Sequence, residues 1–458
     1  MKGLFGMNRD LTVGNPRKVL WSFVLPLLIS VVFQQMYNIA DSVIVGQMSG
    51  SGEAGEAGVA AIGASYPVTM IFMAIALGAN SGCSVIISQL FGSKKFGDMK
   101  TAIYTSFISV LVLSAIFLAA GLPLAKPILK LLETPSDIFS DSISYLNVFI
   151  LAFPFLFVYN VATGIFTSIG DSRTPLYFLI GSSVGNIALD LLFVGVFRWG
   201  VRGAAWATFA AQGIAMAGTL VVLLFRFRLW RDYKCKKFSV AMLKKISLIA
   251  IPSILQQSFV SVGNLFIQAL VNKYGTAVVA GYTAASKLNI FAVNCFVTMS
   301  NGVSNFTAQN YGIEDKARIK QGFKWGCVLS LIISLPFFLM FFIFPNFAVR
   351  LFMSEVSEEA LTAGSHFLMF VSPFYFIICL KLISDGVLRG TVKVWCFLIS
   401  TFSDLLLRVG FAYILAGPLG LQSDGIWLSW PVGWTLSTEI SLIFYFSDIW
   451  SRKLNKTD

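Results

Sequence analysis

The 458-residue sequence has little charge and almost no histidine. Only 12% of its residues are Asp, Glu, Lys or Arg, and it holds one histidine, whereas a soluble domain carries about 25% charged residues. Its six cysteines stand singly without a CxxC spacing, so neither a metal site nor a disulfide framework is expected. A membrane-embedded enzyme would need a nucleophile–base pair or a metal cluster. The scarcity of these residues argues against an enzyme and predicts no organic cofactor.

Apolar residues dominate instead. They make up 56% of the chain, and the mean hydropathy is +0.78. Repeated apolar runs of about 20 residues or more predict an all-α membrane protein, because a helix satisfies its own backbone groups in lipid. We expect twelve spans, at residues 20–45, 59–90, 102–125, 143–168, 175–197, 203–225, 246–272, 277–309, 325–349, 360–388, 394–416 and 425–447.

The basic residues predict the orientation. Most Lys and Arg lie in the N-terminal segment, in the connections after even-numbered spans and in the C-terminal tail. The positive-inside rule then places both termini in the cytoplasm of a multi-pass inner or plasma membrane protein. The net charge of +12 follows from this topology, so no nucleic-acid partner is expected. The predicted parts are a leader (1–19), an N-lobe (20–225), a basic cytosolic linker (226–245), a C-lobe (246–447) and a tail (448–458).

The two predicted lobes are related in sequence. GCSVIISQLFG at 82–92 and GVSNFTAQNYG at 302–312 share a G-x6-Q-x2-G frame. Each half has six spans, so both keep the same orientation, and we predict a parallel repeat about an axis along the membrane normal. Three further matches occur in the same order: Pro26 with Pro252, Pro154-Phe155 with Pro373-Phe374, and Gly170 plus Arg173 with Gly390 plus Lys393.

The first half places two carboxylates inside spans, Asp41 and Asp190, and no Lys or Arg. An ionisable group in a span costs at least about 2.5 kcal/mol on insertion scales. Surroundings of low dielectric favour the neutral form of a carboxyl group. The two carboxylates therefore need a proton, a metal cation or a cationic ligand.

Neutral oxygen atoms are predicted to surround these carboxylates. Thr208 lies at a similar depth in the outer half of the membrane, and Asn186 precedes Asp190 by one helical turn. Asn160 and Tyr37 can contribute oxygen from spans four and one. Such hard ligands suit Na⁺ or a held proton, with Na⁺ expected at Asp41 and Asp190. The alternative is that these groups only join helices, which accounts for Asn and Thr but not for the carboxylates.

The second half carries intramembrane charges of both signs and can neutralise itself. Asp404 and Arg408 are spaced i,i+4 and are predicted to form a structural ion pair. Lys381 and Asp385 have the same spacing near the inner end, where the lysine can snorkel. The full set is Asp385, Asp404 and Glu439 against Lys287, Lys381 and Arg408.

The order of motifs resembles the multidrug and toxic compound extrusion (MATE) family. The resemblance rests on PLLISVVFQQMYNIADSVIVG (26–46), GCSVIISQLFG (82–92), IGDSRTP (169–175), NIALD (186–190) and GAAWAT (203–208). It implies two six-helix lobes around a central cavity, with alternating access. In the branch that resembles DNA-damage-inducible protein F, the cation site of the N-lobe is similar to Asp41, Asn160, Asn186, Asp190 and Thr208 here.

The sequence departs from another branch of that family, in which a glutamate early in the seventh span supports a C-lobe cation site. Here the region reads PSILQQSF, with Gln256 and Gln257. We therefore expect a monomeric, cation-coupled exporter of amphipathic, cationic organic compounds that contacts membrane lipid. The alternative within transport is a flippase for a lipid-linked precursor, which would require cationic residues for a pyrophosphate.

Overall fold

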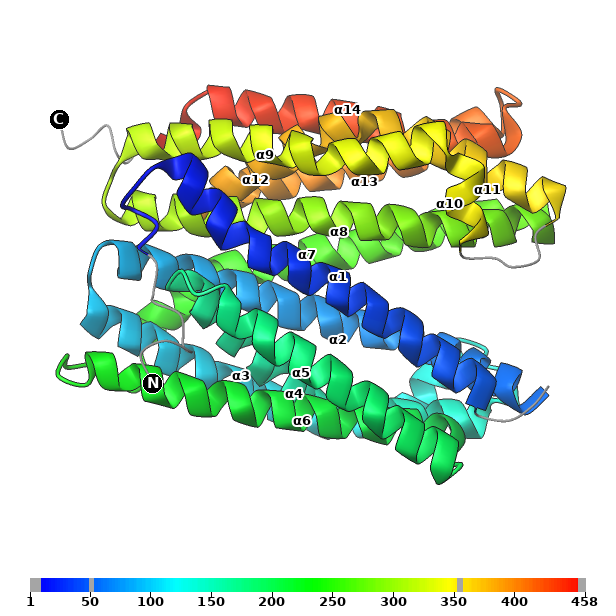
Figure 1. Cartoon of the computed structure of the whole chain (residues 1–458), viewed down its shortest axis with the longest axis horizontal. Coiled ribbons are helices and arrows are strands. Elements are labelled where there is room, and N and C mark those ends of the chain that lie inside the picture. The colour runs from blue at the N-terminus through cyan, green and yellow to red at the C-terminus, as the bar shows by residue number, and fades with distance from the viewer. Residues whose placement is uncertain (1–9, 49–52, 352–356, 452–458) are drawn as a thin grey trace. The chain divides into compact units, whose positions relative to one another are not determined.

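The computed structural model describes residues 10–48, 53–351 and 357–451, without the side chains of residues 39–43, 45–48 and 53–59. Every regular element in these ranges is helical, and the helices run side by side along the long axis of each bundle (Figure 1). They are α1 (Pro16–Met48), α2 (Glu53–Gly92), α3 (Phe96–Leu131), α4 (Phe139–Ser168), α5 (Arg173–Asp190), α6 (Gly200–Phe227), α7 (Val240–Val271), α8 (Thr276–Gly312), α9 (Lys316–Ile343), α10 (Pro345–Arg350), α11 (Glu358–Val371), α12 (Tyr375–Gly390), α13 (Val394–Ala416) and α14 (Gln422–Phe446).

These helices form the twelve predicted spans. A π-helical turn, η1 (Leu191–Val196), continues α5, and a one-turn 3-10 segment, η4 (Ser372–Phe374), joins α11 to α12 into one span. In the described part of the chain, ten spans are apolar and long enough to cross a membrane by composition alone. The other two, α8 and α14, are just as long and pack against α9, α12 and α13.

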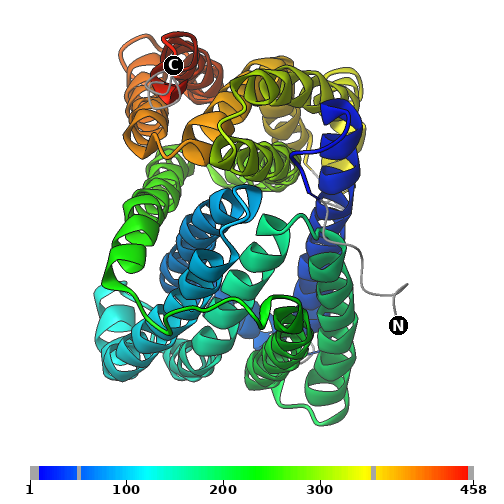
Figure 2. The same cartoon turned by 90° about the vertical axis from the view of Figure 1, so that its left-hand side faces the viewer.

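The chain divides into two compact units. In unit 1, α4 lies against α2, α3 and α6, and α5 packs on α6. In unit 2, α8 lies against α9, α11 and α12, and α14 packs on α13. Figure 2 shows the helices of each bundle close to end-on. Glycines permit the close approach of neighbouring helices: a Cβ on Gly164 would lie 2.6 Å from the side-chain oxygen of Asn80, and one on Gly386 would lie 2.7 Å from the backbone oxygen of Ser300.

The first helix of each half is shared between the units. Residues Leu11–Val24 belong to unit 2, although the rest of α1 belongs to unit 1, and α7 belongs to unit 1 as far as Ile254. Leu11 N donates to Gln309 Oε1 at 2.9 Å, and Arg318 donates to Gly14 O at 2.9 Å and to Leu11 O at 3.0 Å. The start of α1 is therefore fastened to α8 and α9.

Equivalent turns confirm the internal repeat. The turn after α2 has Lys94 at φ 57°, and the turn after α8 has Glu314 at φ 61°. Lys95 N donates to Leu90 O at 2.9 Å, just as Asp315 N donates to Asn310 O at 3.0 Å. The second residue of each pair stands 220 positions after the first, which is the spacing of the G-x6-Q-x2-G frames.

The turns between the fifth and sixth spans also match, with a spacing of 222 positions. Each ends its first helix with two equivalent backbone hydrogen bonds, a residue with positive φ and a glycine in tight contact with the preceding helix. The equivalent features are Trp199 N to Phe193 O (2.9 Å) with Leu421 N to Leu415 O (3.0 Å), Phe197 N to Leu192 O (2.9 Å) with Leu419 N to Ile414 O (3.2 Å), Arg198 (φ 55°) with Gly420 (φ 69°), and Gly203 with Gly425.

The turn before the fifth span corrects one sequence match. Gly170, at φ 77°, is equivalent to Val392, at φ 62°, and not to Gly390. Asp171 N donates to Phe166 O at 2.9 Å, as Lys393 N donates to Leu388 O at 2.7 Å, again 222 positions apart. The motif comparison aligned two glycines, but a β-branched residue holds the left-handed position in the second half.

The prolines of the fourth span also differ in setting. Pro154 lies inside the continuous helix α4, whereas Pro373 lies in η4, which interrupts the corresponding span. Pro26 and Pro252, in contrast, both lie inside the first helix of their half.

The basic linker is fastened to α3. Lys100 Nζ, which is buried, donates to Trp230 O at 2.9 Å and to Tyr233 O at 2.8 Å. Thr101 Oγ1 accepts from Lys236 N, and Thr105 Oγ1 accepts from Ser239 N, both at 3.1 Å. The linker therefore follows the beginning of α3, and its charged side chains from Arg228 onward remain exposed.

Candidate functional site

The end of α5 carries a fully buried carboxylate. Asp190 is the last residue of α5 and is 0% exposed, and Asn186 is 2% exposed. The Asn186 amide nitrogen donates to Asp190 Oδ2 at 2.7 Å, and its oxygen accepts from Thr208 N on α6 at 3.2 Å. The i,i+4 spacing places both side chains on one face of α5, toward α6. Three predicted site residues therefore meet, Thr208 through its backbone.

The local backbone explains this arrangement. The π-helical turn η1 starts directly after Asp190, and such wide turns occur frequently at functional sites. A Cβ on Gly203 would lie 3.0 Å from the carbonyl carbon and oxygen of Phe193, so glycine lets the start of α6 approach η1 this closely without crowding. The sequence analysis did not predict this turn, because LLFVGV carries no signal that distinguishes it from α-helix.

The other predicted ligands lie on α1 and α4. Asn160 is half-buried on α4, and its amide donates to Leu156 O at 2.8 Å, one turn back on its own helix. Tyr37 is half-buried on α1. Asp41 also lies on α1, but its side chain lies outside the described residues. Ile44, one turn further along α1, packs with Val194 of η1.

The repeat identifies the equivalent positions in unit 2. With the spacing of 222 set by the adjoining turns, Asn186 corresponds to Arg408, Asp190 to Ala412 and Thr208 to Trp430. Arg408 is 3% exposed, and its guanidinium carbon lies 4.3 Å from the centroid of the Trp430 ring. Unit 2 thus holds a fixed cation on an aromatic ring where unit 1 holds an amide beside a carboxylate.

The predicted Asp404–Arg408 ion pair does not form in the structure. No ion pair joins the two among the described residues, and Asp404 Oδ1 is buried there without a hydrogen-bond partner. The guanidinium lies against Trp430 of α14 instead, because a planar cation stacks favourably on an aromatic face in a site without water.

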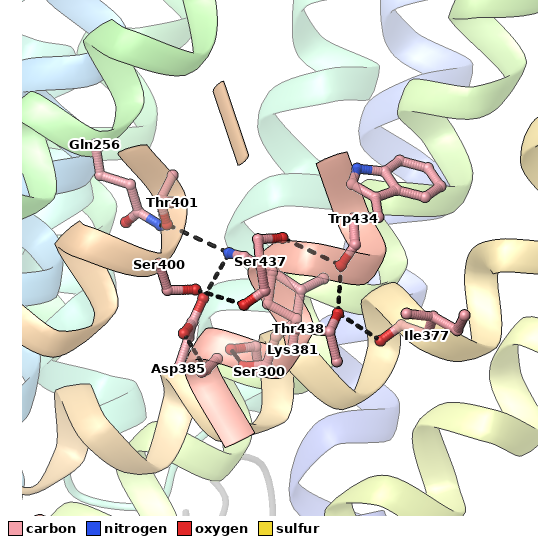
Figure 3. A network of polar contacts seen from close by, with 12 residues as sticks. Gln256, Ser300, Ile377, Lys381, Asp385, Ser400, Thr401, Trp434, Ser437 and Thr438 are labelled. Carbon is pink, nitrogen blue, oxygen red and sulfur yellow. Dashed lines mark hydrogen bonds and ion pairs between the residues drawn. The ribbon is translucent and has the colours of Figure 1, made fainter. Parts of the chain in front are cut away.

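The buried ion pair of unit 2 is Lys381–Asp385. The two charged atoms, Lys381 Nζ and Asp385 Oδ2, lie 2.7 Å apart, and the side chains are 4% and 0% exposed. The expectation that Lys381 snorkels is therefore wrong, because this face of α12 packs inside the unit. Gln256, Thr401 and Lys381 converge from α7, α13 and α12 (Figure 3). The remaining intramembrane charges of this half, Lys287 and Glu439, are exposed.

The motif GDSRTP, between α4 and α5, links two helices within unit 1. Asp171 accepts from Thr174 N at 3.0 Å and from Thr174 Oγ1 at 2.7 Å. Arg226 near the C-terminal end of α6 donates to the same carboxylate at 2.8 Å, and the side chains of Arg226 and Asp171 are 11% and 2% exposed. The motif therefore caps α5 and joins it to α6.

The donor chemistry of these sites limits their ligands. Among the residues that the structure describes, no group of three or more His, Cys, Asp and Glu side chains comes together. A divalent or transition metal usually requires such a group. The site at Asp190 instead offers one buried carboxylate beside a neutral amide, which suits a ligand with a single positive charge.

Known proteins resemble the chain along most of its length. "Probable multidrug resistance protein YpnP" of Bacillus subtilis is 28% identical over 424 residues, which are 91% of this chain and 92% of that protein. "Probable multidrug resistance protein YoeA" of the same organism is 28% identical over 446 residues, 94% of this chain and 93% of that protein.

Solved structures share the fold. A transporter of the MOP superfamily from Pyrococcus furiosus matches with a TM-score of 0.89 at 23% identity, over 96% of this chain and 97% of that chain. A sequence model of the MatE family matches residues 26–192 and residues 252–414, one segment in each half. This multi-pass membrane protein therefore belongs to the MatE family, the multidrug and toxic compound extrusion transporters.

Proposed function

We propose that the protein is an antiporter that exports amphipathic, cationic organic compounds in exchange for Na⁺ or H⁺. The observation that carries the proposal is the complete burial of Asp190 within α5, where its Oδ2 accepts a hydrogen bond from the neutral amide of Asn186. A carboxylate in a membrane helix is costly unless its charge is neutralised. A bound cation removes that cost reversibly, which is the property required of a coupling site.

The proposed mechanism is competition for these carboxylates. When the site faces outward, Na⁺ or H⁺ binds and the organic cation leaves; when it faces inward, the coupling cation leaves and the compound binds. One charge that moves down 100 mV provides about 2.3 kcal/mol, enough for roughly a fifty-fold gradient. We place both termini in the cytoplasm and assign the protein to the inner or plasma membrane as a monomer without an organic cofactor.

Asp41 is the second carboxylate of the proposed site. Ile44, one turn beyond it on α1, packs with Val194 of η1 and Ala204 of α6, so this part of α1 lies near the segment that follows Asp190. Two carboxylates in one site would titrate as a coupled pair. Asn160 is proposed as a further oxygen ligand.

The names of the relatives support drug export over a flippase. The two Bacillus proteins are called multidrug resistance proteins. A pyrophosphate-bearing lipid would also need cationic groups, and the spans of the first half hold no Lys or Arg. The branch similar to DNA-damage-inducible protein F remains a prediction.

The test is transport by purified protein in liposomes. A cationic dye is loaded, and its export is followed under a Na⁺ gradient alone and under a pH gradient alone. We expect one gradient to drive export by the wild type, and Asp190→Asn to abolish it while the protein still folds and inserts. The Asn186 amide can then still contact a neutral side chain of the same shape, so the loss would report the missing charge.

Asp141→Asn is the matched control. Asp141 is half exposed, and its carboxylate lies 3.9 Å from Arg202. A solvent-exposed ion pair at this distance contributes little to stability. The control variant should transport as the wild type does. Export at the wild-type rate by Asp190→Asn would contradict the coupling role of unit 1.

A further inference from the structure

Asp385 in unit 2 has a complete set of partners. Its Oδ2 accepts from Lys381 Nζ at 2.7 Å, and its Oδ1 accepts from Ser441 Oγ at 2.7 Å. Lys381 Nζ also donates to Thr401 Oγ1 at 3.3 Å. Around the ammonium group therefore stand a carboxylate and a hydroxyl, the oxygen ligands that a hard cation prefers.

Four helices meet at this ion pair. Lys381 and Asp385 belong to α12, Thr401 to α13 and Ser441 to α14. Gln256 of α7 donates to Thr401 Oγ1 at 3.0 Å and fixes the position of that hydroxyl (Figure 3). The oxygen atoms are thus held by the fold and not by the lysine alone.

Stability does not explain the pair. Removing two ions from water costs several kcal/mol for each, and apolar residues of similar volume are often as stabilising or more so. In unit 1 the equivalent positions, 222 residues earlier, are Tyr159 and Thr163, which carry no charge at neutral pH. The acid and the base therefore occur together in one half and are both absent from the other.

We propose that Asp385 and Thr401 form a monovalent cation site, with Ser441 holding the carboxylate in place, and that the ammonium group of Lys381 is its tethered occupant. One carboxylate balances one positive charge, so an alkali cation such as Na⁺ fits the site when the lysine is removed. With the lysine in place, the charge of the Asp385 carboxylate is balanced without the exchange of an ion. The inference does not depend on the coupling site in unit 1.

The experiment opens the site by Lys381→Ala, which leaves both the carboxylate and room for an ion. All proteins carry Asp41→Asn and Asp190→Asn, so neither carboxylate of the proposed unit 1 site contributes a response to Na⁺. Thermal unfolding in detergent at pH 8 is measured in NaCl and in choline chloride at equal ionic strength, since choline is too large for the site. The matched control is Lys381→Ala with Asp385→Asn, which has the same cavity without the charge.

We expect NaCl to raise the melting temperature of Lys381→Ala by about 4 °C over choline chloride when Na⁺ is in large excess over its dissociation constant. The parent protein and the double variant should melt at the same temperature in both salts. Equal melting of Lys381→Ala in both salts would overturn the proposal, because the carboxyl group would then be satisfied without a metal ion.

A failure to fold is also informative. Lys381→Ala and the longer Lys381→Met are therefore both purified in saturating NaCl and examined by size-exclusion chromatography. The proposal requires a monodisperse peak for Lys381→Ala in NaCl, since Na⁺ replaces the lost ammonium group. Aggregation of both variants in NaCl would overturn it.

Discussion

The hairpin of the fifth and sixth spans has an equivalent turn in both units, but the charged groups beside it differ. In unit 1 it presents an amide and a carboxylate, Asn186 and Asp190, to the backbone of α6. In unit 2 the equivalent place holds Arg408 on the ring of Trp430. Three backbone hydrogen bonds of the turn recur at equivalent positions in the two hairpins. A duplicated scaffold thus keeps its geometry while one copy offers oxygen atoms for a cation and the other carries a permanent cation.

The strongest test of this difference transfers the cation from unit 2 to unit 1. Asn186→Arg places a guanidinium one turn from Asp190, where it should occupy the carboxylate permanently. We expect gradient-driven dye export to fall to the level of empty liposomes, with normal insertion. Asn186→Ala removes the amide without adding charge and should retain part of the transport. Equal activity of the two variants would show that charge at this position does not govern coupling.

A second comparison concerns the inner turns, where Asp171 of unit 1 corresponds to Lys393 of unit 2. Asp171→Ala removes the cap of α5 and leaves Arg226 without this carboxylate. Breaking a buried ion pair from one side costs about 3–5 kcal/mol, and the shift is read as a lower melting temperature in detergent. Asp232→Ala, next to the exposed Arg231, is the control and should melt as the wild type does. A shift no larger than that of the control would show that the Asp171–Arg226 ion pair does not stabilise unit 1.

Double-mutant cycles can measure which neighbour Arg408 interacts with more strongly, Trp430 or Asp404. Arg408→Met with Trp430→Leu should give a coupling energy of about 1–2 kcal/mol, the range of a desolvated cation–π contact. The cycle of Arg408→Met with Asp404→Asn should give a smaller value, because no ion pair joins the two side chains in the described structure. Both energies are measured by thermal unfolding. A larger coupling energy for the second cycle would show that Arg408 and Asp404 are paired, as the i,i+4 spacing suggests.

The smallest effect is expected at Thr208. Asn186 contacts the backbone N–H of this residue, so Thr208→Ala keeps the contact. The half-saturating concentration of the coupling cation should change by about two-fold at most, equivalent to ~0.4 kcal/mol. A ten-fold change in the same liposome assay would identify the hydroxyl as a direct ligand.

The sequence predicted the features that depend on spacing along one helix. The apolar runs located the twelve spans, and the distance of four residues between Asn186 and Asp190 placed both on one face of α5. The meeting with Thr208 followed from depth, because the two helices are joined by a short turn. Asp41 and Asn160 remain predictions as ligands.

Features that depend on which face a helix buries could not be predicted. Lys381 lies near the inner end of its span, and depth alone suggested that it would reach water, yet its face of α12 packs inside unit 2. For Arg408, the spacing offered Asp404 as a partner, but the choice depended on where α14 places Trp430. The inner turn misled the motif comparison because Val392 adopts a positive φ that favours glycine.

The fastening of the N-terminal segment to unit 2 has a consequence for biosynthesis. Leu11 bonds to Gln309, which is made 298 residues later. At translation rates of about 5–20 residues per second, Leu11 waits roughly 15 to 60 seconds for its partner. Residues up to Ile254 in α7 belong in turn to unit 1. Neither half is therefore complete when it leaves the ribosome by itself, and a gene split at the linker would yield two fragments that each lack a segment carried by the other.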